Sequence, residues 1–215
     1  MRNAIARLLM LAGLTLAAPA HADGEKAGEF DYYVMALSWS ANWCAIEGDA
    51  KRSPQCDEAE DFGWTLHGLW PQYHRGWPAF CPTVAPHPRR SMTAEMADIM
   101  GTSGLAWYQW KKHGVCSGLS AADYYTLSRR AYDSVVRPPV FHKLDKPVRL
   151  PAKLVEEAFL KANPEMEPDM VTVTCRNRMI QEVRICLSRD LTPVPCGRDA
   201  VRDCSLDDAL FNPVR

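Results

Sequence analysis

The chain has 215 residues, 47% of them hydrophobic, and a formal net charge of −1 at pH 7. This length and apolar content suffice for one domain with a substantial core. The near-neutral charge excludes a strongly basic protein that binds nucleic acid over its whole surface, so any nucleic-acid site must be local.

The first 22 residues have the pattern of a cleaved export signal. Arg2 and Arg7 precede an apolar run over residues 8–18, and residues 20–22 (Ala-His-Ala) supply a small-x-small cleavage site. The run is shorter than the roughly 20 residues that span a bilayer, which disfavours a membrane anchor. Cleavage would leave a mature domain of residues 23–215 with 23 basic and 26 acidic side chains, in the periplasm or outside the cell.

All the cysteines lie in the mature part. They are Cys44, Cys56, Cys81, Cys116, Cys175, Cys186, Cys196 and Cys204. An even number on an exported chain predicts four disulfide bonds. A zinc site would need close pairs such as Cys-x2-Cys, and the sequence has none.

The N-terminal half opens with a predicted strand and continues largely as loop. Residues 30–40 are rich in aromatic side chains and partly alternate, which indicates a core strand. Residues 45–63 are acidic and polar, and residues 64–73 form a compact aromatic block. Residues 77–90 contain four prolines and little periodicity, which is typical of a loop.

Apolar residues at helical spacing follow this loop. They predict helices over residues 93–100, 105–113, 121–136 and 151–162. Ser91 or Thr93 is available to cap the first helix and Ser120 the third, while Gly114 ends the second.

Two alternating segments, residues 170–175 and 179–187, then predict an antiparallel hairpin, and the tail from Ser188 is irregular. Strands and helices do not alternate regularly. We therefore predict a single α+β domain with a central, mainly antiparallel sheet flanked by helices and stapled by disulfides.

Two blocks each place a histidine beside a glycine among aromatic residues. Residues 64–72 read Trp-Thr-Leu-His-Gly-Leu-Trp-Pro-Gln and contain His67; residues 107–116 read Trp-Tyr-Gln-Trp-Lys-Lys-His-Gly-Val-Cys and contain His113. A lone histidine is more often a buried structural residue, but two such blocks on one exported chain favour acid–base chemistry. RNA cleavage needs a base for the 2′-hydroxyl and an acid for the leaving 5′-oxygen, and imidazole can serve as either.

Lys112, immediately before His113, is a candidate cation for the charge that builds on the phosphorus centre. Lys111 is expected to be a solvated neighbour. The attacking nucleophile belongs to the substrate, so we expect no metal and no cofactor.

The two blocks closely resemble the active-site segments of the ribonuclease T2 family. Residues 65–71 match the first segment, and Lys-His-Gly-x-Cys at residues 112–116 matches the end of the second. Residues 30–39 and 182–186 resemble the opening strand and a late core strand of that family, so the resemblance covers most of residues 30–204.

The resemblance implies an endoribonuclease with little base preference that makes a 2′,3′-cyclic phosphate and then a 3′-phosphate. It implies that His67 is the general acid, His113 the general base and Lys112 the cation, and that Trp70 stacks on a base. Ordinary core packing is the competing interpretation of Trp70. The sequence also suggests Gln72 as a substrate-binding residue.

The second segment departs from the family pattern at two positions, where the family usually has His-Glu and this chain has Tyr108 and Gln109. Tyr108 can still donate a hydrogen bond to a phosphate. Gln109 keeps a hydrogen-bonding shape but cannot titrate or carry charge. We therefore predict activity that is retained, with a reduced rate or a shifted pH profile.

The resemblance also implies a disulfide pairing. The pairs are Cys81–Cys116, Cys175–Cys204, Cys186–Cys196 and, by subtraction, Cys44–Cys56.

Two other functions compete with an active ribonuclease. A catalytically weakened relative that binds RNA or a protein partner is suggested by Tyr108 and Gln109. A zinc hydrolase built from His67, His74 or His87 is disfavoured, because the chain has no His-x3-His pair. For the active enzyme we expect RNA as substrate, no cleavage of DNA, which lacks the 2′-hydroxyl, no membrane anchor after signal cleavage, and a monomer.

Overall fold

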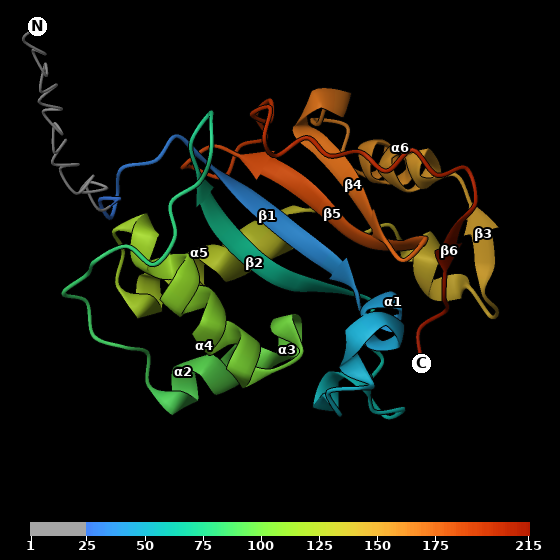
Figure 1. Ribbon diagram of the computed structural model, residues 1–215, viewed down its shortest axis with the longest axis horizontal. Helices are drawn as coiled ribbons and strands as arrows, with labels where there is room; N and C mark the ends of the chain where they lie inside the picture. The colour runs from blue at the N-terminus through green and yellow to red at the C-terminus, as the bar shows by residue number, and fades with distance from the viewer. Residues whose placement is uncertain (1–24) are drawn as a thin grey trace, which may run out of the picture.

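The computed structural model describes residues 25–215, so the predicted signal at residues 1–22 lies outside the described residues. Within this range no helix combines the length and the apolar character that crossing a membrane requires. One six-stranded sheet is flanked by helices (Figure 1). The predicted α+β architecture is confirmed.

The sheet is mainly antiparallel. Its strands are β1 (Tyr32–Trp39), β2 (Trp64–Gln72), β3 (Val148–Leu150), β4 (Val171–Arg176), β5 (Met179–Leu187) and β6 (Ala209–Phe211). Their order is β2-β1-β5-β6-β3, with β4 also paired to β5, and only the β5–β6 pair is parallel. The sequence analysis assigned no element to β2, β3 or β6. Since β3 and β6 have three residues each, they are too short to show a period-two pattern.

All four predicted helices are present with shifted ends. The helices of the structure are α1 (Ser40–Trp43), α2 (Arg90–Glu95), α3 (Ala97–Met100), α4 (Ser103–Lys112), α5 (Ala121–Ser134) and α6 (Ala152–Ala162). The first predicted helix is divided into α2 and α3, and α1 was not predicted. Single π or 3-10 turns occur at Cys44–Gly48, Pro54–Cys56, Gly114–Ser117, Pro139–Lys143 and Pro168–Met170.

The predicted cap of the first helix is wrong, whereas that of the third is correct. The first helix begins at Arg90, and the hydroxyl of Thr93 donates to the carbonyl of Arg90 inside it, 3.0 Å away, instead of capping it. Ser120 caps α5 by accepting from the backbone N–H of Asp123. Thr102, which was not predicted, caps α4.

Strand β1 is buried along its whole length between β2 and β5. Strand β2 is the edge strand, and helices α4 and α5 lie alongside it (Figure 1). Two tyrosines of α5 donate hydrogen bonds to backbone carbonyls of β2, Tyr124 to Leu69 and Tyr132 to Trp64. The exposed edge of the sheet is thereby covered.

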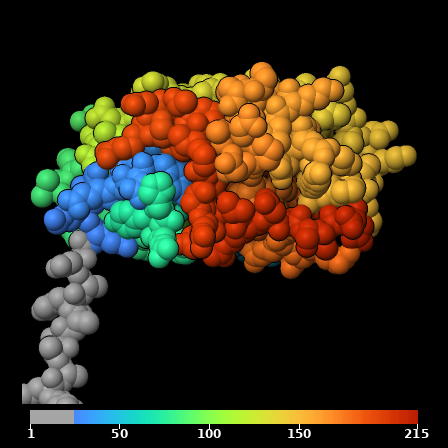
Figure 2. Space-filling model, turned by 90° about the horizontal axis from the view of Figure 1, so that it is seen from above, coloured from blue at the N-terminus to red at the C-terminus, as the bar shows by residue number. Residues whose placement is uncertain are grey.

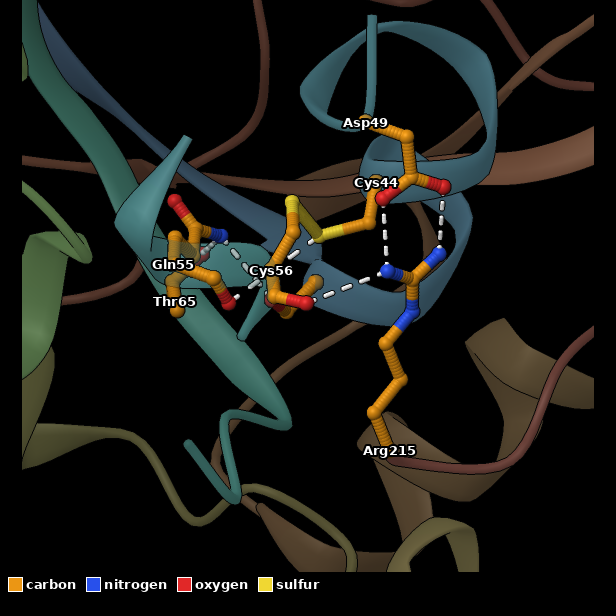
Figure 3. The surroundings of a disulfide bond; sticks show 7 residues. Cys44, Asp49, Gln55, Cys56, Thr65 and Arg215 are labelled. Atoms are coloured by element: carbon orange, nitrogen blue, oxygen red, sulfur yellow. Dashed lines mark hydrogen bonds and ion pairs between the residues drawn. A yellow bond between two sulfur atoms is a disulfide. The ribbon is translucent and has the colours of Figure 1, made fainter. Parts of the chain in front are cut away.

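Four disulfides staple the fold, in the pairs that the family resemblance implies. The Cys44–Cys56 bond closes the turn that follows β1, and Figure 3 shows the C-terminal residue beside it. The guanidinium of Arg215 donates to both carboxylate oxygens of Asp49 at 2.6 Å and to the carbonyl of Cys56 at 3.2 Å. The C-terminal residue is thus fixed to the disulfide-closed segment that follows β1.

The irregular segment after β5, which begins at Ser188, packs against part of the sheet. Ala200 packs with Tyr32, Val34 and Cys186 in a small apolar cluster, and the backbone N–H of Gly197 donates to the hydroxyl of Tyr32. Figure 2 shows this segment, in red, against the blue residues of the N-terminal part.

Candidate active site

A β-bulge in β2 sets the position of His67. Leu66 pairs with Leu37 and Gly68 pairs with Ala36, so His67 is an extra residue between two consecutive pairs. A bulge redirects the side chain of the extra residue and is common beside active sites. It lets His67 leave the regular alternation and face the same side of the sheet as Glu182 on β5.

A buried carboxylate holds the His67 ring. Nδ1 of His67 lies 2.5 Å from Oε1 of Glu182, whose side chain is 1% exposed. Arg184 donates to the other carboxylate oxygen through Nε and Nη2, at 2.9 and 2.7 Å. Burial alone raises the pKa of Glu182, but the hydrogen bonds and charges of His67 and Arg184 outweigh it and lower the pKa to about 2. Glu182 is therefore ionised at neutral and mildly acidic pH.

His113 lies at the C-terminal end of α4. Its backbone N–H donates to the carbonyl of Gln109, and three residues later Cys116 is bonded to Cys81. The residue is 5% exposed, and its Nδ1 has no hydrogen-bond partner among the described residues. Burial, followed by the charges of Lys112 and His67, lowers the pKa of His113 from 6.5 to about 3. The imidazole is therefore neutral at neutral and mildly acidic pH.

Trp70 lies between the two histidines. Its ring meets the His67 ring edge-on at a centroid distance of 5.2 Å and stacks on the His113 ring at 5.3 Å. The guanidinium of Arg184 lies 5.3 Å from the centroid of the same indole. Both histidine rings thus lie against the same indole.

Gln109 fixes the indole from the helix side. Nε1 of Trp70 donates to Oε1 of Gln109 at 2.8 Å. Because an indole N–H can only donate, the amide oxygen must face Trp70, and the amide NH2 group of Gln109 is directed elsewhere. A Cβ on Gly68 would lie 2.3 Å from both polar atoms, so this contact requires glycine at that position.

All seven residues predicted for catalysis or substrate binding line one cleft of about 290 Å³. They are His67, Trp70, Gln72, Tyr108, Gln109, Lys112 and His113. Tyr108 is 45% exposed, whereas Gln72 is buried beneath the cleft. Lys112, Arg184 and Arg202 bring positive charge to its wall.

The histidines of the zinc alternative do not come together. His74 stacks on Tyr32, and His87 lies against Trp107. Among residues 25–215 there is no group of three or more His, Cys, Asp or Glu side chains placed to hold a metal ion.

Seven further residues of the site were not predicted from the sequence. They are Glu182 and Arg184, and also Val34, Trp77, Asp199, Ala200 and Arg202. One signal was available for the first two. They are charged residues two apart in a mostly apolar strand, so they share one face of the sheet, where unpaired charges are costly. Trp77 and Arg202 lie in loops, where no pattern distinguishes them.

Comparison with known proteins is consistent with this geometry. Residues 30–196 match the family model described as the Ribonuclease T2 family. The chain is 36% identical to "Ribonuclease" from Aeromonas hydrophila over 97% of this chain and 99% of that protein. It is 24% identical to "Ribonuclease I" from Escherichia coli (strain K12), over 93% and 90% of the two chains.

Two further relatives are informative. The solved structure of an "RNase-related protein from Calystegia sepium" superposes with a TM-score of 0.65 at 20% identity, over 86% of this chain and 99% of that one, which shows the shared fold. A "Ribonuclease-like storage protein" from Panax ginseng is 25% identical over 82% of this chain and 76% of that protein.

Proposed function

This chain belongs to the ribonuclease T2 family, and we propose that it is a metal-independent endoribonuclease that cleaves RNA by transphosphorylation. The observation that carries the proposal is the pair of imidazoles on one cleft in unlike environments. One has its Nδ1 against an ionised carboxylate, and the other is buried and neutral.

In the proposed first step, neutral His113 accepts the proton of the 2′-hydroxyl. The 2′-oxygen forms a bond to phosphorus, and the bond from phosphorus to the 5′-oxygen breaks as His67 gives that oxygen a proton. Glu182 accepts the Nδ1–H of His67, so Nε2 is the atom that transfers the proton. The products are a 2′,3′-cyclic phosphate and a free 5′-hydroxyl.

In the proposed second step the two histidines exchange roles. His67, now neutral, takes a proton from water as the water oxygen bonds to phosphorus. The bond from phosphorus to the 2′-oxygen breaks as His113, now protonated, returns its proton to that oxygen, and a 3′-phosphate results. Both imidazoles then regain their starting protonation states.

Negative charge on the non-bridging oxygens is stabilised by the walls of the cleft. Lys112 supplies a cation, and the amide NH2 group of Gln109 supplies a neutral donor whose direction is set by Trp70. Preorganised donors of this kind stabilise the transition state more than the substrate.

Base stacking is proposed mainly for the exposed aromatic residues of the cleft. Trp77 and Tyr108 are 47% and 45% exposed, whereas Trp70 already packs against His113 and Arg184. Every base has a π-face, so such platforms fit a relaxed base preference. Trp70 then contributes chiefly by holding the histidines in position.

The wider setting follows from the same proposal. RNA is the substrate and DNA is inert, because the 2′-hydroxyl is a reactant. We propose export to the periplasm or the medium, consistent with four disulfides, and action as a monomer without cofactor.

A mass-spectrometric assay of the product ends tests the proposal. Purified protein with yeast RNA and EDTA should yield 2′,3′-cyclic phosphate ends first and 3′-phosphate ends later, and His113→Ala should abolish both. Products with 5′-phosphate ends, or activity lost in EDTA, would contradict the mechanism.

The second candidate is a weakened relative that binds RNA or a protein. Gln109 stands where the family usually has a carboxylate, which favours this candidate. One relative is named a ribonuclease-like storage protein, which also favours it. Stoichiometric RNA binding without acid-soluble products would decide for this candidate.

A further inference from the structure

A group of aromatic and basic residues lies on the outer side of α4, outside the cleft. Trp107 is 41% exposed, and the ammonium of Lys111, one helical turn later, lies 5.4 Å from its ring centroid. The ring of His87, from the loop before α2, lies 6.5 Å from the same indole. Arg89 and Arg90 follow His87 after one proline and are exposed. We name these five residues the α4 strip.

Neither the fold nor the active site accounts for the α4 strip. The indole of Trp107 contributes little to the core, since the buried residues of the helix are Ala106, Gln109 and Trp110. For Lys111, Arg89 and Arg90 no carboxylate lies within 4.0 Å in the part of the chain that the structure describes. On a chain with a net charge of −1, such a local excess of cations is conspicuous.

The α4 strip is continuous with the cleft. Tyr108, next to Trp107, lines the cleft, and Lys112, next to Lys111, does so too. Helix α4 thus presents two aromatic–lysine pairs side by side, one inside the cleft and one outside. The loop before α2 is tied to the same helix, because the backbone N–H of Phe80 donates to the carbonyl of Lys112 at 2.8 Å.

We propose that the α4 strip is an additional binding site for the substrate RNA, which takes a nucleotide beyond the two that flank the scissile bond. This inference rests on the proposed function. A base stacks on Trp107, and the neighbouring phosphates lie against Lys111 and the two arginines. Cations interleaved with exposed aromatic rings are how single strands are bound without sequence preference.

The test compares a polymer with a substrate too short to reach the α4 strip. Single-stranded RNA of about 15 nucleotides and a dinucleoside monophosphate are cleaved by the wild type, Trp107→Ala and Lys111→Ala. Stacking is worth about 1–3 kcal/mol per base, so Trp107→Ala should raise KM for the polymer by roughly 5- to 160-fold. Its kcat on the polymer and both constants on the dinucleoside should not change.

The salt dependence gives a second readout. Each phosphate contact to a single strand contributes about −0.7 to the slope of log affinity against log salt, so Lys111→Ala should make the slope for the polymer shallower by about that amount. The matched controls are Leu154→Ala and Lys161→Ala, an exposed apolar residue and an exposed lysine on α6, far from the cleft in sequence. They should leave KM and the slope unchanged.

The outcomes separate the two proposals. Unchanged polymer kinetics in Trp107→Ala would overturn the additional site, whether or not the α4 strip serves some other contact such as a second copy of the chain. An equal loss on both substrates would also overturn it, because the effect would then come from the packing of α4 around His113. A wild type that cleaves neither substrate would refute the proposed function itself.

Discussion

The two halves of the cleft place the same side chain in opposite surroundings. His67 lies on a bulged strand with its side chain 35% exposed and its Nδ1 against a buried carboxylate. His113 lies at the end of a helix, is 5% exposed, and has an Nδ1 without a partner in residues 25–215. Charge and hydrogen bonds thus surround His67, whereas burial dominates the surroundings of His113.

This difference supports the roles that we propose for the two residues. A general base must be unprotonated before reaction. Burial lowers the pKa of His113 to about 3 and thus keeps the imidazole unprotonated above that pH. A general acid must present its proton in one direction, and the carboxylate of Glu182 sets that direction for His67. In the proposed mechanism, the environment and not the residue type distinguishes the acid from the base.

Removing either imidazole should produce the largest effect. His67→Ala and His113→Ala should each lower kcat on RNA by about 10²- to 10⁴-fold, the usual contribution of a general acid or base. The release of acid-soluble nucleotides measures the rate, and far-ultraviolet circular dichroism checks the fold.

His74→Ala is the matched control, since that side chain is 78% exposed and does not line the cleft. It should retain full activity. If the His67 and His113 variants kept more than a tenth of the wild-type rate, neither residue could be the acid or the base.

Glu182→Gln should break the sheet half of the comparison while leaving the helix half intact. Glutamine retains a similar shape but not the charge. The His67 ring therefore loses its negatively charged partner, and Arg184 loses its ion pair. Loss of such a supporting partner is expected to lower kcat by about 10- to 100-fold.

KM should change little, because substrate contacts remain. Glu157→Gln on α6, an exposed carboxylate, is the control and should be silent. A variant with wild-type kcat would show that the carboxylate does not position His67.

The sequence predicted the local parts of this comparison better than the long-range ones. Both histidines stand in short aromatic segments, so their neighbours in the chain are also their neighbours in the cleft. Glu182 is 115 residues away from His67 in the chain, and no local pattern links them. The bulge that turns His67 also needs the pairing with β1 to be known.

Element types followed the same rule. Helices α5 and α6 have long periodic patterns and were predicted within two residues at each end. Strand β2 was not assigned, because a glycine and a proline interrupt its alternation. Its aromatic residues serve the core at one end and the cleft at the other.

The burial of neutral His113 should appear in the stability of the protein. In the folded state its pKa is about 3, and the unfolded value is near 6.5, so protons bind the unfolded state more strongly between these values. The free energy of unfolding should therefore fall as the pH drops from 6.5 toward 3. Each pH unit corresponds to about 1.4 kcal/mol for one group.

His113→Gln sharpens this prediction, because it removes the group but not the fold. Urea unfolding at pH 6.5 and 4.5 should show a wild-type loss larger than that of the variant by about 1–3 kcal/mol. Below pH 4.5 both proteins should lose further stability, since Glu182 has a folded-state pKa of about 2. Equal losses down to pH 4.5 would mean that His113 is protonated in the folded protein.

The smallest expected effect concerns the residue that joins the two halves. The side chain of Gln109 lines the cleft. Its amide oxygen accepts the N–H of Trp70, and its amide NH2 group is directed elsewhere.

In Gln109→Glu, one carboxylate oxygen can still accept from Trp70, but the other places an anion where the wild type has a donor. It should repel the phosphate when ionised and donate when protonated. Of the two outcomes predicted from the departure from the family pattern, a reduced rate or a shifted pH profile, this geometry favours the shifted profile. The rate of Gln109→Glu should be about tenfold lower than that of the wild type near pH 7 and approach it as the pH falls. Gln109→Met, which has no donor, should instead be slower by a similar factor at every pH. The ratio of variant to wild-type kcat between pH 4 and 8 measures this, and a flat ratio for Gln109→Glu would show that the amide does not reach the phosphoryl group. The side chain of Gln109, which joins the two halves of the cleft through Trp70, would then take no part in the reaction.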